Sequence, residues 1–407
     1  MSDLQAKLAE LSGFITKERC KRLLIELVRV PSPQTALMEA EPLLRAFIET
    51  EVEPRLRAMG FSDIRYDPMG NLISTIGAGR SGRSLMLITN AMNQPAATMA
   101  NAYAGDVADG RAFGLSGEVV LGKGASEQKA NMAAMLIAME AALGSGAALE
   151  GRLVHVCCVS GETGSHAAIR SVIEGEGVRA DLAYLGGTSL MTTLGNRGRV
   201  DVFITVQGAP THSSRPEDGA NAITGAMEVI RRLASEITLD RTHPTLGRQT
   251  LTINRIRSFP ESTHTIQASC DLTVDRRLLP GEDPDAAFAE IAAVARGIEA
   301  WPDPASGKPF RVEVKLGPFM YPSLVTTESE VVQELFAASR LALGVEPEAF
   351  YSPAAFDQGY LNHVGIPTVN WGPGEYKFAH TDFDLAAVDR VRDAALVFAA
   401  MILRRLG

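Results

Sequence analysis

The 407-residue sequence contains little cysteine: Cys20, Cys157, Cys158 and Cys270 are the only four, and none belongs to a C-x-x-C pair. In so long a chain, this small number argues against a disulfide framework. Cys157 and Cys158 fall inside a predicted strand, where a thiol is far more often part of the core than a nucleophile. We therefore expect buried free thiols, which fits a protein of the reducing cytoplasm.

The sequence also lacks a long apolar run near its start and an excess of positive charge. Residues 1–30 alternate charged residues and leucine at helical spacing, so no export signal and no membrane span is readable there. Lys and Arg number 39 against 48 Asp and Glu, and the formal net charge of -9 repels phosphate backbones and anionic lipid head groups. We expect a cytoplasmic protein whose partners include neither nucleic acid nor membrane.

Two common catalytic motifs are absent as well. The sequence has no G-x-x-x-x-G-K-[ST] and no G-x-S-x-G, the usual marks of phosphate-binding loops and serine hydrolases. One G-x-G-x-x-G, from Gly77 to Gly82, lies between two predicted strands and opens no helix. We interpret it as a hairpin loop rather than a dinucleotide site.

The pattern that is present predicts a globular protein of two domains, with 46% apolar and 21% charged residues. The elements expected in the first part are helices over 11–28, 37–59, 129–143 and 166–174 and strands over 64–66, 72–76, 84–89, 153–159 and 182–185. The strand over 84–89 is a near-continuous apolar run, as in a buried parallel strand. The alternation of helix and strand indicates an α/β domain.

From Gly195 onward the element order changes to β-α-β-β-α-β, which indicates a self-contained α+β (ferredoxin-like) domain. Its expected elements are strands over 200–207, 250–256, 266–274 and 310–316 and helices over 220–234 and 283–299. A helix over 328–343, a strand over 368–371 and a helix over 385–403 then return to the first domain. We predict an α/β domain over 1–195 and 318–407, with an inserted domain over 196–317.

Four polar clusters fall where predicted strands end or helices begin, the usual place of the site in an open α/β sheet. They are Leu121–Lys129, Ser160–Ser165, Phe356–Gly359 and Gly372–Asp382. Each alone is readily a capped loop. Together with Tyr66–Leu72, Gly195–Arg199, Val206–His212 and Asp275–Arg277, they make the chain resemble, over nearly its whole length, the M20 peptidase and aminoacylase family of di-metal amidohydrolases, most closely its ArgE/DapE-type deacylases. The resemblance implies a zinc-exopeptidase-like catalytic α/β domain with an inserted lid domain that also forms a homodimer.

Compared with the family pattern, several site residues are missing. The first metal-binding histidine of the family falls on Asn90, and the aspartate that supports it falls on Met92. The glutamate that serves as general base falls on Gly161, and the carboxylate of the Glu-Pro-Thr motif falls on Gly186. In the family, the residues at the positions of Asn90 and Gly186 bind only one of the two ions. The resemblance therefore implies that this ion is lost.

The ligands of the other ion are retained. The resemblance places them at Glu127, where the family has a bridging aspartate, at Glu162 and at His380. Two carboxylates and one imidazole with an open position form a reasonable site for zinc or manganese. We predict at most one divalent metal ion, and Glu127, no longer needed as a bridge, is a candidate for the missing base.

The lid carries the remaining predicted site residues. His212 matches the family histidine that reaches the partner's active site and polarises the scissile carbonyl. Arg276 or Arg277 and His264 are expected to recognise a polar or carboxylate-bearing substrate. Asn90 is a further candidate for substrate binding.

These assignments favour a hydrolase of C–N bonds in small acylated or carbamoylated amino-acid-like compounds. The alternative is a metal-free relative with non-hydrolytic chemistry or a ligand-binding role, which the loss of the base and two ligands would fit. Retention of Glu127, Glu162, His380 and His212 favours catalysis, because a binding protein gains little from keeping mutually repelling carboxylates.

Overall fold

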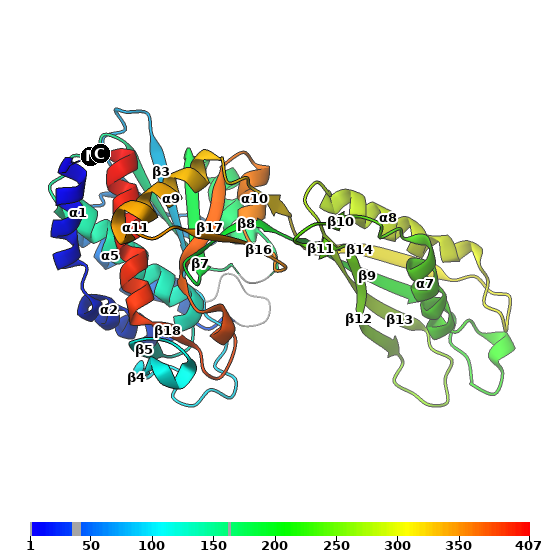
Figure 1. Cartoon of the computed structure of the whole chain (residues 1–407). Coiled ribbons are helices and arrows are strands. Elements are labelled where there is room, and N and C mark those ends of the chain that lie inside the picture. The colour runs from blue at the N-terminus through cyan, green and yellow to red at the C-terminus, as the bar shows by residue number, and fades with distance from the viewer. Residues whose placement is uncertain (1, 35–41, 162–163) are drawn as a thin grey trace. The chain divides into compact units, whose positions relative to one another are not determined.

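A computed structural model describes residues 2–34, 42–161 and 164–407. The chain forms two compact units (Figure 1). Unit 1 comprises Met1–Leu194, Val325–Phe350 and Tyr360–Gly407, and unit 2 comprises Gly195–Leu324 and Tyr351–Gly359. The short segment Tyr351–Gly359 therefore belongs to unit 2, although the residues before it, Val325–Phe350, belong to unit 1. No helix in these described ranges is long and apolar enough to cross a membrane.

Unit 1 is built on a mixed sheet with the strand order β1-β2-β6-β3-β7-β17-β8. The strands are β1 (Asp63–Tyr66), β2 (Leu72–Ile76), β3 (Ser84–Asn90), β6 (Arg152–Cys158), β7 (Leu182–Thr188), β8 (Met191–Asn196) and β17 (Thr368–Gly374). β3 is parallel to both β6 and β7, and β17 is parallel to β7. The predicted buried parallel strand is thus confirmed as β3, whose apolar residues are all buried. Parallel pairing brings the carboxyl ends of β6, β3, β7 and β17 to one edge of the sheet.

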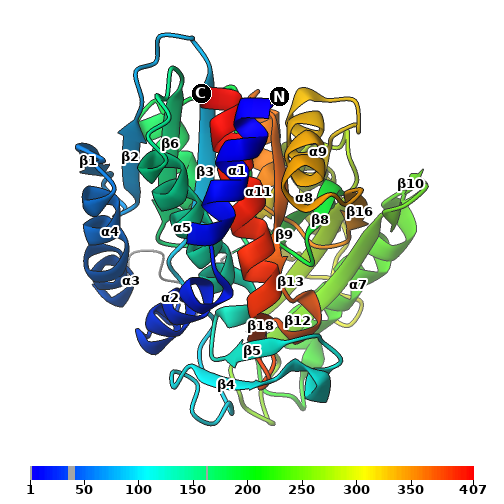
Figure 2. The ribbon, with the colours of Figure 1, turned by 60° about the vertical axis from the view of Figure 1, so that its left-hand side comes forward.

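Helices cover this sheet and complete the core of unit 1. They are α1 (Ser2–Phe14), α2 (Lys17–Arg29), α3 (Pro42–Phe47), α4 (Glu53–Ala58), α5 (Ala130–Gly144), α6 (Ala167–Arg170), α9 (Glu330–Leu343), α10 (Gln358–His363) and α11 (Val388–Leu406). Short turns are η1 (Ile48–Val52), η2 (Gly110–Phe113), η3 (Ala125–Lys129), η4 (Ser171–Gly175) and η7 (Tyr376–Phe378). α5 is largely apolar and buried and packs against α11 and β17, with Glu140 as its partly exposed charged residue. Figure 2 shows α11 in red, with α1 beside it in blue.

Short strands complete the chain between the larger elements. β18 (Leu385–Ala387), β5 (Glu118–Leu121) and β4 (Asp106–Asp109) form a small antiparallel sheet, and β16 spans Glu348–Ser352. Val119, Phe378, Leu385 and Ala387 form the buried cluster of the small sheet. β5 precedes η3, which contains Glu127, and β18 follows His380. Pairing of β5 with β18 therefore holds these two predicted site segments near each other.

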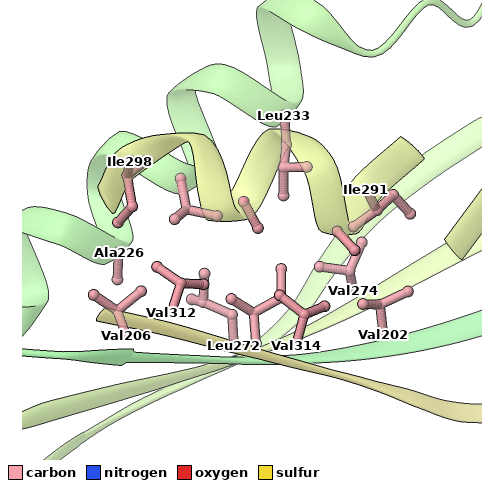
Figure 3. Packing of buried hydrophobic residues seen from close by; sticks show 14 of the residues in the cluster. Val202, Val206, Ala226, Leu233, Leu272, Val274, Ile291, Ile298, Val312 and Val314 are labelled. Carbon is pink, nitrogen blue, oxygen red and sulfur yellow. The ribbon is translucent and has the colours of Figure 1, made fainter. Parts of the chain in front are cut away.

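Unit 2 has the predicted β-α-β-β-α-β order. Its elements are β9 (Gly198–Gln207), η5 (Pro216–Asp218), α7 (Ala222–Glu236), β10 (Thr242–His243), β11 (Gly247–Arg248), β12 (Thr250–Phe259), β13 (Ser269–Leu278), α8 (Pro284–Arg296), η6 (Gly297–Ala300), β14 (Arg311–Met320) and β15 (Ser323–Leu324). The sheet order β12-β13-β9-β14 is antiparallel throughout. Figure 3 shows alternate residues of these strands, such as Val202 and Val206, packed against Leu233 and Ile291 of the two helices.

Several sequence predictions need correction. The helix expected over 11–28 is two helices, because Thr16 adopts an extended conformation and caps α2 through its side chain. The G-x-G-x-x-G segment is not a hairpin loop, since β6 lies between β2 and β3 in the sheet. The helix expected from residue 385 begins only at Val388, after β18. Of the helix expected over 37–59, residues 37–41 lie outside the described residues, and the rest forms α3, η1 and α4.

Candidate functional site

The centre of the candidate site is a contact between Glu127 and His380. The Nε2 atom of His380 lies 3.1 Å from Oε2 of Glu127. Both side chains are accessible, with 54% of His380 and 26% of Glu127 exposed. Glu127 belongs to η3, a π-helical turn that leads into α5, and His380 follows η7 with a positive φ of 62°. Such turns and such backbone angles are frequent at functional sites, where the surrounding structure must hold them in place.

A buried pair, Lys123 and Asp384, holds the two loops that carry this contact. The Asp384 carboxylate accepts hydrogen bonds from the backbone N–H groups of Gly124 (2.7 Å) and Ser126 (2.8 Å). Lys123 donates from Nζ to the carbonyl oxygen of Thr381 at 3.2 Å, and this ammonium lies 4.0 Å from Asp384. Burial raises the pKa of Asp384, and the two N–H donors and Lys123 oppose that rise. The backbones before Glu127 and after His380 are thereby fixed to one another.

A second buried carboxylate, Glu375, fixes the same loop to α11. Its backbone N–H donates to the carbonyl oxygen of Ser126 at 2.7 Å, and its carboxylate pairs with Arg390 at 2.7 Å. Burial raises the pKa of Glu375 to about 7, against the opposing effect of Arg390. Both ends of the segment that carries His380 are therefore anchored.

Asparagine side chains lie beside Gly161 and Gly186, where the resemblance implied a lost general base and a lost metal ligand. A Cβ atom added at Gly161 would lie 2.4 Å from Nδ2 of Asn90, so the Asn90 amide fills the space beside that glycine. A Cβ atom added at Gly186 would lie 2.7 Å from Cβ and Cγ of Asn131. Oδ1 of Asn90 is buried and has no hydrogen-bond partner among the described residues. Asn90 and Gly186 therefore offer neither the imidazole nor the carboxylate that the resemblance requires for an ion at this side of the site.

The Glu127 and His380 side chains, in contrast, fit two ligands of one divalent ion. The predicted third ligand, Glu162, lies outside the described residues. Over residues 2–34, 42–161 and 164–407, no group of three or more His, Cys, Asp or Glu residues could hold a metal ion. A carboxylate and an imidazole that face each other are nevertheless the donor types that zinc and manganese accept.

The lid histidine His212 is exposed in unit 2, and its tautomer can be assigned. Its Nδ1 atom accepts a hydrogen bond from the backbone N–H of Ser214 at 3.2 Å and lies 2.8 Å from Oγ of the same residue. Because a backbone N–H can only donate, Nδ1 carries no proton and the neutral ring has its proton on Nε2. The neighbouring backbone pairs with the His264 segment, through a bond from Ser213 N–H to the His264 carbonyl oxygen at 3.0 Å. The structure thus brings two predicted lid residues, His212 and His264, to one place.

The two predicted arginines have different surroundings. Arg276 is only 2% exposed and pairs with Glu282 at 2.9 Å, and burial lowers its pKa. This guanidinium is a structural part of unit 2, so the expectation that Arg276 binds substrate does not fit its position. Arg277 is partly exposed and pairs with Asp275 at 2.9 Å. Of the two, only Arg277 keeps access to a ligand.

The four cysteines have no predicted role in the site, whereas three polar residues around it carry no recognisable signal in the sequence. All four cysteines are free and buried, and burial raises the pKa of the Cys157 thiol to about 12, which makes it a poor nucleophile. These three polar residues are Lys123, Asn131 and Asp384. Lys123 lies in one of the polar clusters, and Asp384 follows another closely, but their partners lie far away in the sequence.

Comparison with known proteins supports the family assignment. The model of the peptidase dimerisation domain of the M20 family matches residues 194–301. The chain is 26% identical to succinyl-diaminopimelate desuccinylase of Phenylobacterium zucineum, over 93% of this chain and 96% of the relative. It is 27% identical to acetylornithine deacetylase of Myxococcus xanthus, over 86% of this chain and 90% of the relative.

Solved structures show the same fold. A metallo-carboxypeptidase of the M20 family from Sulfolobus solfataricus superposes with a TM-score of 0.74 at 16% identity, covering 93% of this chain and 97% of that one. The match spans both units, so the α/β unit with its inserted domain is common to the two proteins. The matched dimerisation domain and the two deacylase relatives support the assignment of the chain to the M20 family of peptidases and ArgE/DapE-type deacylases, and with it a hydrolase activity.

Proposed function

We propose that this protein hydrolyses the C–N bond of small acylated or carbamoylated amino-acid-like compounds, with at most one divalent ion held by Glu127, Glu162 and His380. The observation that carries the proposal is the 3.1 Å contact between Glu127 and His380, on two loops that buried residues fix together. The names of the desuccinylase and deacetylase relatives support an acyl group on nitrogen as the point of attack. The M20 family generally uses divalent metal ions, and zinc or manganese suits these ligands best.

When bound, such an ion supplies Lewis acidity toward a carbonyl group and lets water ionise near neutral pH. The protein must supply the remaining steps from its own side chains. Glu127, freed from bridging two ions, accepts the proton of the attacking water, because the family's base position is Gly161 here. Its accessible carboxylate, beside His380, can serve as ligand and base in turn.

His212 polarises the scissile carbonyl from the partner subunit of a homodimer. Its neutral form keeps the proton on Nε2, which is the donor that a developing oxyanion requires. Dimerisation through unit 2 is supported by the matched dimerisation domain. It is also supported by β12, an edge strand whose Ile256 and Phe259 are 55% and 65% exposed. Arg277 and His264 are proposed to recognise the polar part of the substrate, and Asn90 to line its pocket.

The first test is the metal content of the protein, purified without a nickel column and measured by plasma mass spectrometry. We expect about one zinc or manganese per chain in the wild type and none in a Glu162→Ala/His380→Ala variant. His363→Ala, which removes an exposed histidine with no predicted role, is the matched control and should keep its metal. The loaded enzyme is then screened against N-acyl and N-carbamoyl amino acids. A wild-type protein that stays metal-free after dialysis against zinc and manganese would contradict the mechanism.

A further inference from the structure

Two glycines of the central sheet leave a space that the side chain of Asn131 fills. Gly186 lies near the end of β7, and Gly372 lies in β17 at the point where the register between the two strands shifts. A Cβ atom at Gly372 would lie 1.8 Å from Oδ1 of Asn131, and one at Gly186 would lie 2.7 Å from its Cβ and Cγ atoms. No residue larger than glycine fits at either position while Asn131 keeps its place.

The Asn131 amide uses both its donor and its acceptor groups there. Nδ2 donates to the carbonyl oxygens of Glu127, at 2.6 Å, and of Gly187, at 3.0 Å. Oδ1 accepts the backbone N–H of Gly187 at 3.0 Å. The side chain is 4% exposed, so these bonds are protected from water. One neutral side chain on α5 thereby ties η3, which carries Glu127, to the end of β7.

We propose that Asn131 takes the structural place of the ion that this side of the family site would hold, and that it is a positioning residue for Glu127. A shared cation draws several loops together, but it requires ligands such as carboxylate oxygens or imidazole nitrogens at about 2.0–2.2 Å. Here the carboxylate position is Gly186, and a hydrogen-bonded amide joins the same segments without charge. The proposed limit of one metal ion per chain then follows from the position of Asn131 as well as from the lost ligands. The part of this inference that concerns ion number rests on the proposed function.

The arrangement at Asn90 follows the same pattern. There too a glycine, Gly161, replaces an acidic residue of the family, and an asparagine amide lies 2.4 Å from where its Cβ would be. At Gly161 and at Gly186, an acidic residue of the family is thus replaced by glycine, and an asparagine amide fills the space beside the glycine. Restoring the ligands alone would force a glutamate side chain into a filled space.

Metal stoichiometry tests whether Asn131 excludes an ion. We compare the wild type with an Asn90→His/Gly186→Glu variant, and with the same variant carrying Asn131→Gly in addition. We expect no more zinc per chain in the double variant than in the wild type, and one additional zinc in the triple variant. Circular dichroism and gel filtration establish that each variant is folded. A second zinc in the double variant, or none gained by a folded triple variant, would overturn the exclusion.

Hydrogen exchange tests the positioning role independently of metal and of whether the triple variant folds. In Asn131→Ala, the Gly187 amide loses its acceptor and should exchange at least tenfold faster than in the wild type. Asn131→Asp keeps that acceptor but not the donors to Glu127 and Gly187, so it should retain more protection at Gly187 than the alanine variant does. Zinc dissociation constants should rise about tenfold in Asn131→Ala, as for other residues that orient a ligand. Unchanged exchange at Gly187 would overturn the role of Asn131, whereas a metal-free wild type with faster exchange in Asn131→Ala would overturn only the metal mechanism.

Discussion

Lys123 and Asp384 lie 4.0 Å apart, each with 3% of its side chain exposed, and they join the loop before Glu127 to the loop after His380. The Asp384 carboxylate accepts two backbone N–H groups and also faces the Lys123 ammonium. Lys123 in turn donates to the Thr381 carbonyl oxygen. The buried Lys123–Asp384 pair thus supports the loops that carry the accessible Glu127–His380 pair.

We predict that Asp384→Asn destabilises the protein more than Lys123→Met does. Asparagine has a single acceptor oxygen, so one of the two buried N–H groups, of Gly124 or Ser126, loses its acceptor. The Lys123 ammonium also loses its counter-charge, and breaking a buried pair costs about 3–5 kcal/mol. In Lys123→Met, Asp384 keeps both N–H donors, and the cost should be smaller, about 1–3 kcal/mol. Urea unfolding measures both. Lys315→Met, on the exposed surface of unit 2, is the control and should change stability by less than about 0.5 kcal/mol. Equal stability of the two variants would argue against this division of roles.

Most helices and strands of unit 1 could be predicted, because the residues of each element indicate its type without knowledge of its neighbours. The apolar run over 84–89 identifies β3 without any knowledge of its neighbours, and the polar clusters follow strand ends by simple alternation. The β-α-β-β-α-β order of unit 2 is likewise visible in element order. Short strands such as β5 and β18 were missed, because their pairing partners, not their own residues, make them strands.

The arrangement of the site was predictable only in part. Glu127 and His380 could be identified by resemblance, and the structure brings them into contact. The role of Asn131 could not be identified, because it depends on the absence of side chains at Gly186 and Gly372, which lie on two other strands. The involvement of Arg276 in a buried pair with Glu282 could not be foreseen either, since neighbouring arginines on a strand differ only in the face to which they point.

His155 should make the protein sensitive to acid. The imidazole is fully buried in β6, with Nε2 3.1 Å from Oγ1 of Thr89, and burial lowers its pKa to about 3 from an ordinary value of 6.5. The unfolded chain therefore binds a proton that the folded chain does not, and the free energy of unfolding falls as pH decreases from about 6.5 to about 3. We expect His155→Gln to lose less stability across this window than the wild type, by a few kcal/mol. Urea unfolding at pH 7 and pH 4.5 measures the difference, and parallel curves for the two proteins would exclude His155 as the cause.

Glu375 should act in the opposite direction. Its pKa is raised to about 7 by burial from an ordinary value of 4.5, so the folded protein holds a proton that the unfolded chain has released. This contribution to stability is complete below pH 4.5 and is lost as pH rises through about 7. Glu375→Gln, which cannot ionise, should therefore show a smaller loss of stability between pH 5 and pH 8 than the wild type. Thermal unfolding at these pH values tests the prediction, with Glu346→Gln as the exposed control. A steeper loss in Glu375→Gln would contradict it.

The proposed role of His212 in the partner's site can be tested by mixing two inactive variants. If each site combines Glu127 of one protomer with His212 of the partner, Glu127→Gln and His212→Ala homodimers are both impaired. Random exchange of equal amounts makes half of the dimers mixed, and each mixed dimer has one site with both residues intact, so activity should recover to about a quarter of the wild-type value. If His212 acted on the site of its own chain, every site would lack one residue and mixing would restore nothing. The measurement is hydrolysis after refolding the variants together, compared with the same variants refolded separately and then combined. Recovery only in the co-refolded sample would establish that the two subunits share each active site.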